Sequence, residues 1–195
     1  MNRTLHGLVL AGGNSERMQS DKALLNYHGQ PQLQWAYDLI DKLCDHTYIS
    51  VRSDQHDEIR DALPRIEDTV DNLGPGAGLL AAAAMAPDAA WLAIACDLPF
   101  ITPQTINNLI DERDPSSMAT AYRSANDRLP EPLCTIWEPT GLAYLREMVD
   151  QGIVCPRKIL IRGDTHLLNP ISASALENIN TPAGHADAMG ILGPR

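Results

Sequence analysis

Short apolar segments alternate with longer helix-like segments through the first half of the chain, and this order leaves few folds open. We expect strands at residues 5–10, 47–51 and 91–95, and helices at residues 32–43, 56–63, 78–85 and 106–112. Thr102 and Pro103 mark the start of the last helix, because a hydroxyl can cap it and proline suits its first position. The βαβα order indicates an α/β fold with a mostly parallel sheet and helices on both faces.

The second half of the chain is less regular. We expect strands at residues 117–122 and 132–137 around an exposed loop at 123–128, and helices at residues 139–152 and 156–162. Residues 182–195 contain several glycines and prolines, so we expect this end to fray. The length of 195 residues is typical of one domain, and no linker divides it, so we expect a single domain over residues 1–195.

Composition excludes several classes of function. The formal net charge of −10, with no dense block of Lys and Arg, argues against binding of nucleic acid. No apolar run approaches the ~20 residues of a membrane span, and only Arg3 precedes the first strand with no signal-like segment after it, so we expect a cytoplasmic protein without a membrane partner. The four cysteines and six histidines show no metal-ligand spacing, and we expect buried free thiols.

The first expected strand leads into a glycine-rich turn. Gly12 and Gly13 follow the strand directly, and Ser15, Arg17 and Lys22 come soon after. Glycine lets backbone N–H groups approach an anion closely, and these side chains add donors and positive charge. The turn lacks the endings of the P-loop and of the dinucleotide fingerprint. It therefore predicts a polyphosphate site of another kind.

A single carboxylate, Asp97, ends the buried strand at residues 91–95, and Pro99 stiffens the turn that follows. Ligands of open parallel sheets bind beyond the carboxyl ends of the strands, where the glycine turn also lies. A phosphate site there needs a divalent cation, and Mg²⁺ takes one or two carboxylates together with phosphate oxygens. We therefore expect Asp97 to bind Mg²⁺.

A third pattern places a carboxylate before a second glycine-rich segment. Glu67 and Asp68 precede residues 74–78, which contain three glycines and begin a helix. The backbone of such a segment can lie against a flat base or a ribose. Asp68 can accept hydrogen bonds from ring N–H and amino groups of the kind that guanine offers.

These three patterns together resemble the molybdenum cofactor guanylyltransferase family, the MobA-like members of the nucleotidyltransferase superfamily. The shared motifs are Leu10-Ala11-Gly12-Gly13, Ser15, Arg17-Met18, Asp21-Lys22-Ala23, Glu67-Asp68, Gly74-Pro75, Ala77-Gly78, Cys96-Asp97-Leu98-Pro99-Phe100 and Asn178-Ile179-Asn180-Thr181-Pro182. The first motif is shared with many sugar-phosphate and cytidylyl transferases. The double glycine and the later motifs together are narrower and favour the guanylyl branch.

The resemblance implies a three-layer α/β/α Rossmann-like nucleotidyltransferase fold and a reaction that transfers GMP from GTP to Mo-molybdopterin, with release of pyrophosphate. Molybdoenzymes or their chaperones would be further partners, and Mg²⁺ the cofactor. The implied catalytic residues are Lys22, Arg17 and Asp97, with Asp97 as the metal ligand. The implied nucleotide-binding residues are Leu10, Ala11, Gly12, Gly13, Lys22, Asp68 and Asp97, and Asn180 would lie on the acceptor side.

Two alternatives stay open at this point. The same reaction could use other substrates, which would make the protein a molybdopterin cytidylyltransferase or a sugar-phosphate nucleotidyltransferase. A protein of another class, a non-catalytic nucleotide-binding accessory protein, is suggested by Gln19, which stands where the family usually has a glycine.

Overall fold

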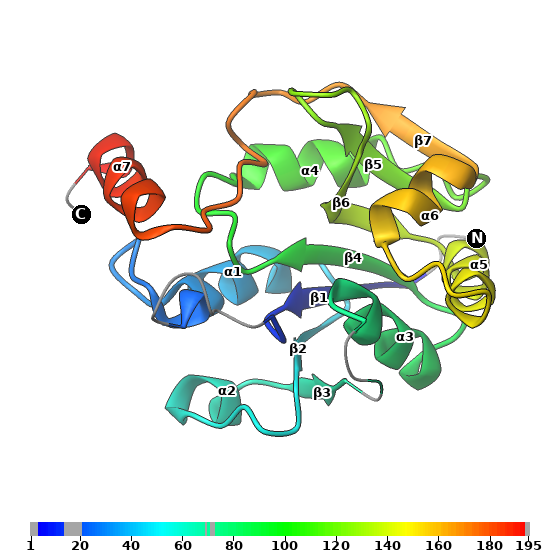
Figure 1. Cartoon of the computed structure of the whole chain (residues 1–195), viewed down its shortest axis with the longest axis horizontal. Helices are drawn as coiled ribbons and strands as arrows, with labels where there is room; N and C mark the ends of the chain where they lie inside the picture. The colour runs from blue at the N-terminus through cyan, green and yellow to red at the C-terminus, as the bar shows by residue number, and fades with distance from the viewer. Residues whose placement is uncertain (1–3, 14–20, 69, 71–72, 194–195) are drawn as a thin grey trace.

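One twisted sheet joins all the strands of the computed structural model, which describes residues 4–13, 21–68, 70 and 73–193 (Figure 1). The strands are β1 (Leu5–Leu10), β2 (His46–Val51), β3 (Arg65–Glu67), β4 (Ala90–Ala95), β5 (Ala119–Arg123), β6 (Pro130–Trp137) and β7 (Thr165–Leu168). Their spatial order is β3-β2-β1-β4-β6-β5-β7. Among these strands β6 alone pairs antiparallel with its neighbours, so the mostly parallel sheet is confirmed.

Helices cover both faces of the sheet. They are α1 (Gln32–Asp41), α2 (Glu58–Ala62), α3 (Pro75–Met85), α4 (Pro103–Asp111), α5 (Pro139–Asp150), α6 (Pro156–Arg162) and α7 (Pro182–Leu192), with a short 3-10 helix η1 (Lys22–Leu24). Leu33 of α1 and Ile106 of α4 are buried in the core on one face. Leu79 of α3, Leu145 of α5 and Ile159 of α6 are buried on the other. This arrangement confirms the expected three-layer α/β/α fold.

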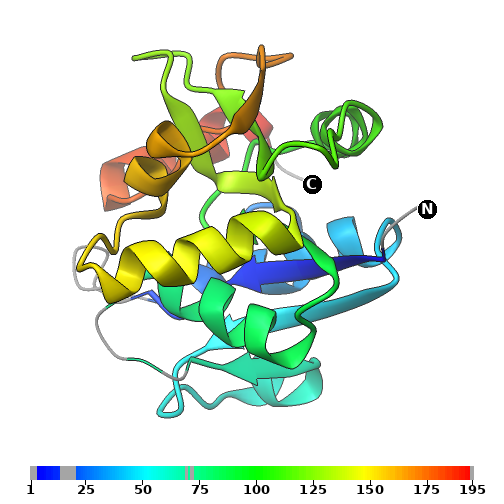
Figure 2. The same ribbon diagram turned by 90° about the vertical axis from the view of Figure 1, so that its right-hand side faces the viewer.

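The sequence of β4 and α3 explains the middle of the core. All six residues of β4 are buried, as expected of a strand that is covered on both faces. The residues from Leu79 to Ala82 of α3 are also buried, and the small side chains of Ala81 and Ala82 let α3 lie close to the sheet and beside α5 (Figure 2). Helices therefore cover β4 on both faces of the sheet.

One prediction about a helix end is confirmed and another is wrong. Thr102 caps α4 as expected, because its side chain accepts a hydrogen bond from the backbone N–H of Thr105 at 3.2 Å. The expectation that residues 182–195 fray is wrong for the described part, where α7 forms. Thr181 caps α7, Pro182 occupies its first turn, and Gly193 follows its end with φ +73°. The proline and glycine therefore mark the ends of a helix.

The strands β3 and β7 were not expected from the sequence. They contain three and four residues and lie at the two edges of the sheet. Strands this short carry little pattern of their own, and pairing with β2 and with β5 defines them. Asp68, which the sequence predicts to bind the nucleotide, follows the edge strand β3 directly.

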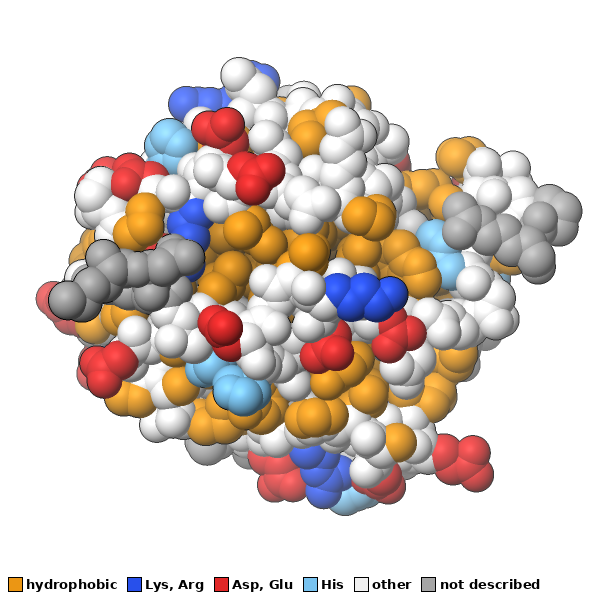
Figure 3. Space-filling view, turned by 180° about the vertical axis from the view of Figure 1, so that it is seen from behind, with side chains coloured by type: hydrophobic (Ala, Val, Ile, Leu, Met, Phe, Trp, Pro, Cys, Tyr) orange, Lys and Arg blue, Asp and Glu red, His pale blue; other side chains and the backbone are white. Residues whose placement is uncertain are grey.

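The distribution of charged side chains on the surface is in keeping with the net negative charge of the sequence. In the face shown in Figure 3, the coloured Lys and Arg side chains are scattered among acidic ones and form no broad basic patch. None of the helices built from described residues has both the length and the apolar character that a membrane crossing requires.

Substitution of Gly141 tests the contact between α5 and the strand β5. A Cβ atom at Gly141 would overlap the backbone carbonyl of Met118, which precedes β5, whereas a Cβ atom at Gly190 of α7 meets no atom within 4 Å. We expect Gly141→Ala to lower the free energy of unfolding by about 1–3 kcal/mol, as in other overpacked sites. Gly190→Ala is the matched control and is expected to leave stability equal or higher. Urea denaturation measures both, and equal stability of the two variants would contradict this view of the contact.

Candidate functional site

A cavity lies at the carboxyl edge of the parallel strands. The residues that follow β1, β3 and β4 converge on it, together with η1 and the first turn of α3. The predicted residues that line it are Leu10, Ala11, Gly12, Gly13, Lys22, Asp68 and Asp97. The predicted Arg17 lies outside the described residues. The structure thus brings together the glycine turn, the two carboxylates and the lysine.

Strand pairing brings the glycine turn close to Asp68. Leu10 pairs with Ser50, and the backbone N–H of Asp68 donates to the carbonyl of Val51 at 2.8 Å. The Ser50 hydroxyl then donates to Oδ1 of Asp68 at 2.7 Å. A Cβ atom on Gly12 would lie 2.5 Å from Oδ2 of Asp68. Glycine is therefore required at position 12 for the carboxylate to occupy this place.

Arg52 also contacts the glycine turn. Its Nη1 donates to the carbonyl oxygen of Gly12 at 2.9 Å, while its Nε donates to Asp54 at 2.9 Å. Burial raises the pKa of the Asp68 carboxyl, although the Ser50 hydrogen bond and the charge of Arg52 oppose the shift. Ser50 and Arg52 were not selected from the sequence as site residues, and only their place at the end of an expected strand could have indicated them.

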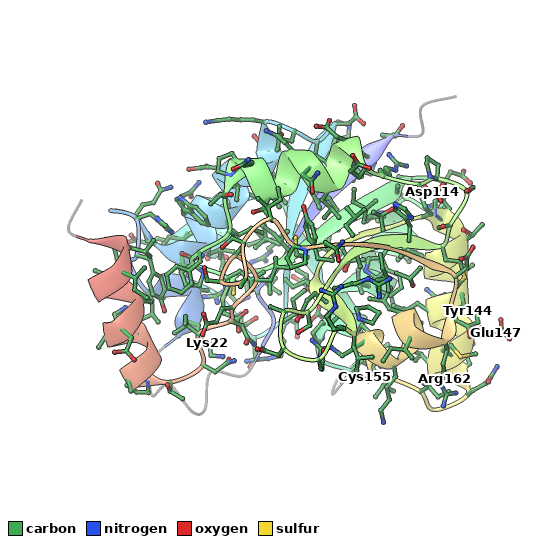
Figure 4. The ribbon with its side chains drawn as sticks, turned by 90° about the horizontal axis from the view of Figure 1, so that it is seen from above. Lys22, Asp114, Tyr144, Glu147, Cys155 and Arg162 are labelled. Atoms are coloured by element: carbon green, nitrogen blue, oxygen red, sulfur yellow. The ribbon has the colours of Figure 1, made fainter. Side chains whose placement is uncertain are left out.

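Asp97, Lys22 and Asn180 meet at the other side of the cavity. Nζ of Lys22 lies 3.5 Å from Oδ2 of Asp97 and donates a short hydrogen bond to Oδ1 of Asn180. The backbone N–H of Ile179 donates to the Asp97 carbonyl at 3.0 Å, which fixes the late segment beside the loop after β4. Figure 4 shows Lys22 at the end of the molecule where α7 lies, far from the labelled residues of α5 and α6.

The carboxylate of Asp97 suits a divalent cation. Its Oδ1 is buried and has no hydrogen-bond partner among the described residues. Burial raises the pKa of Asp97, and the charge of Lys22 only partly opposes this. An ionised oxygen without a partner in such a place is stabilised by a cation. No group of three or more His, Cys, Asp or Glu side chains with metal-site geometry occurs in the described part of the chain, so phosphate oxygens would complete the coordination of a cation here.

Cys96 also lines the cavity but is not suited to act as a nucleophile. Burial, with the nearby charges of Asp97 and Asp21, raises the pKa of its thiol to about 12. The thiol is therefore protonated at neutral pH, and the reactive form is the thiolate. Cys96 and Cys134 are buried as expected, but Cys44 is half-buried and Cys155 is exposed, so the expectation of buried thiols is wrong for Cys155.

A second cavity adjoins the first. Pro75 and Leu133 line both cavities, so the two share a wall. The second cavity is bounded by the loop after β5, the start of β6, the start of α6 and the segment before Asn180. Arg157 contributes to it and forms ion pairs with Asp127 at 3.1 Å and Glu131 at 2.9 Å.

Comparison with known proteins identifies the family. The family model described as the MobA-like NTP transferase domain matches residues 7–166, which include the glycine turn, Asp68 and Asp97. The chain belongs to this family. Its match runs from the first strand to the start of β7, so it covers nearly the whole sheet.

Relatives of this MobA-like domain include named enzymes. The molybdenum cofactor biosynthesis bifunctional protein of Synechocystis sp. is 39% identical over 91% of the chain, and the chain spans 52% of that protein, or about half its length. The molybdenum cofactor guanylyltransferase of Pseudomonas fluorescens is 30% identical, over 90% of the chain and 88% of that protein.

Solved structures agree on the fold of the MobA-like domain. Molybdopterin-guanine dinucleotide biosynthesis protein A from Archaeoglobus fulgidus has a TM-score of 0.76 at 21% identity, over 95% of this chain and 97% of that one. At this identity the similarity concerns the fold, and it agrees with the α/β/α sandwich described above.

The raised pKa of Asp97 predicts how stability depends on pH. The folded state holds this proton more tightly than the unfolded chain does, so the free energy of unfolding falls as the pH rises from 3.8 through the folded pKa. Asp97→Asn removes this titration. We therefore expect the stability of the variant relative to wild type to be greater at pH 7 than at pH 4, measured by urea denaturation. Asp88→Asn, in an exposed turn, is the control, and a difference that does not vary with pH would contradict the buried carboxylate.

The close approach of Gly12 to Asp68 predicts a difference between the two glycines of the turn. Gly12→Ala forces Asp68 to move, whereas a Cβ atom on Gly13 meets no atom of the described residues within 4 Å. We expect Gly12→Ala to weaken binding of a nucleoside triphosphate at least about tenfold, which corresponds to ~1.4 kcal/mol, and Gly13→Ala to have a smaller effect. Isothermal titration calorimetry measures both. Equal affinities of the two variants would show that Asp68 and Gly12 do not cooperate in binding.

Proposed function

We propose that this protein is a molybdenum cofactor guanylyltransferase, which transfers GMP from GTP to the terminal phosphate of Mo-molybdopterin and releases pyrophosphate. The observation that carries the proposal is the convergence of Gly12, Asp68, Lys22 and Asp97 on one cavity at the carboxyl edge of a MobA-like domain. The names of the relatives support the same activity.

Asp68 accounts for the choice of base. Its Oδ1 accepts from Ser50 and can accept a second hydrogen bond, and its Oδ2 lies against the glycine turn at the wall of the cavity. Guanine presents an N–H and an amino group side by side, and an ionised carboxylate accepts from both. Cytosine presents an amino group next to an acceptor nitrogen, which the second carboxylate oxygen would repel. Asp68 in its ionised form therefore favours guanine.

Lys22, Arg17 and the backbone N–H groups of Gly12 and Gly13 bind the triphosphate. An oxygen of the acceptor phosphate attacks the α-phosphorus in line, a new P–O bond forms, and the bond to the leaving pyrophosphate breaks. The attacking phosphate is ionised near neutral pH, so no protein base is required. The side chains position the two substrates and stabilise the charge that develops on the leaving group.

Asp97 would hold Mg²⁺ through its unpartnered Oδ1. The ion, when bound, neutralises charge on the phosphate oxygens and orients them. Lys22 beside Asp97 supplies a second positive charge at the same end of the cavity. Asp97 and Lys22 therefore act as a pair on the triphosphate.

The second cavity suits the acceptor because it shares Pro75 and Leu133 with the first. An acceptor there would present its terminal phosphate near Asn180, which contacts Lys22. Molybdoenzymes or their chaperones would receive the product. We also propose that the protein acts in the cytoplasm.

Release of pyrophosphate tests the proposal directly. Purified protein is mixed with molybdopterin, molybdate, Mg²⁺ and each of GTP, CTP, ATP and UTP, and we expect turnover with GTP far above the others. Asp97→Asn should lower the rate by at least ~10²-fold, as expected for loss of preorganised charge stabilisation, while circular dichroism shows an intact fold.

Three results would change the assignment. Preferred turnover with CTP would make the protein a cytidylyltransferase, and tight binding of GTP without release would favour an accessory protein. Turnover by Asp97→Asn at the rate of the Asp88→Asn control would remove Asp97 from the catalytic residues.

A further inference from the structure

A buried arginine pairs with Asp21, one of the residues that line the cavity at the carboxyl edge of the sheet. Arg60 belongs to α2, a helix of five residues beside the edge of the sheet, yet only 1% of the residue is exposed. A guanidinium group removed from water is strongly destabilising unless charged partners surround it. The packing of a short surface helix alone therefore does not explain why the guanidinium group of Arg60 is buried.

Two carboxylates hold the guanidinium group. Nη1 donates a short hydrogen bond to Oδ2 of Asp57, the residue that caps α2, and Nη2 lies 2.8 Å from Oδ2 of Asp21. Burial alone would lower the pKa of Arg60, but Asp57 and Asp21 outweigh it and raise the pKa. Arg60 is therefore a permanent positive charge that links α2 to a residue distant in the sequence.

Asp21 is part of the nucleotide cavity. It caps η1, because its Oδ1 accepts from the backbone N–H of Ala23 at 3.0 Å, and it lines the cavity itself. Lys22 is the next residue, and its side chain reaches Asp97 and Asn180. One oxygen of Asp21 therefore fixes the helix that carries Lys22, and the other is paired with Arg60.

We propose that Arg60 is a positioning residue for the nucleoside triphosphate: it acts through Asp21, whose charge it neutralises while Asp21 caps the helix that carries Lys22. This inference rests on the proposed function only in that the cavity binds a triphosphate. Without Arg60, the carboxylate of Asp21 stands in the cavity without its cationic partner and repels an anionic ligand. That repulsion grows with the charge of the ligand, so it affects GTP more than GMP.

A comparison of ligands separates this role from a purely structural one. We expect Arg60→Met to weaken GTP binding about tenfold while GMP binding changes less than about threefold. Asp21→Asn retains the cap, since asparagine caps helices as well as aspartate does, and removes the repulsive charge. The double variant Arg60→Met/Asp21→Asn should therefore bind GTP nearly as wild type does.

Arg65→Met is the matched control. Arg65 lies close in sequence and pairs with Asp61 and Glu67, but its side chain is 30% exposed and it does not line the cavity. We expect this variant to bind GTP and GMP as wild type does. Calorimetric titration with Mg²⁺ present measures affinities for all variants, and thermal unfolding reports their stability.

Equal weakening of GTP and GMP in Arg60→Met, or failure of Asp21→Asn to restore GTP binding, would overturn the proposal. If Arg60→Met does not fold, the double variant decides, because it removes both charges together; a loss of more than tenfold in its GTP affinity would be contrary evidence. The titrations use whichever triphosphate the wild-type protein prefers. A preference for CTP would therefore count against the proposed function and leave the test of Arg60 intact.

Discussion

The parallel pairing of β1 with β2 and β4 determines where the glycine turn and the two carboxylates of the site lie. Leu10 pairs with Ser50 on one side and with Ala95 on the other, so the chain leaves all three strands at the same level. The glycine turn and Asp97 reach the cavity from this level, and β3 adds Asp68 through its pairing with β2. A shift of one residue in any pairing would turn the side chains to the opposite face.

The same edge holds two of the carboxylates that line the cavity. Asp68 and Asp97 are largely removed from water, and burial raises the pKa of both. Two apolar layers on either side of the sheet hold these groups in place and offset their unfavourable burial. Burial of such carboxylates lowers the stability of the fold, but it holds them preorganised for a charged ligand.

Local patterns predicted much of this structure, and contacts between distant residues account for what they missed. The buried strand β4, the cap at Thr102 and the glycine turn are visible in consecutive residues. The strands β3 and β7 are too short to show a pattern, and α7 was missed because glycine and proline at its ends resembled a loop. Three contacts of the site join residues that are 18 to 158 positions apart in the sequence. They are the hydrogen bond of Ser50 with Asp68, the ion pair of Arg60 with Asp21 and the contact of Lys22 with Asn180. No pattern in consecutive residues predicts such contacts.

The reversal of β6 has a consequence for how such a domain can evolve. Because β6 runs against its neighbours, its first residues, among them Glu131 and Leu133, arrive at the edge where the other strands end. This strand therefore acts as a partition between two compartments, one built from β1 to β4 and the other from β5 to β7 and the segments after them. Changes in the second compartment can alter the molecule that meets the nucleotide while the first compartment stays as it is.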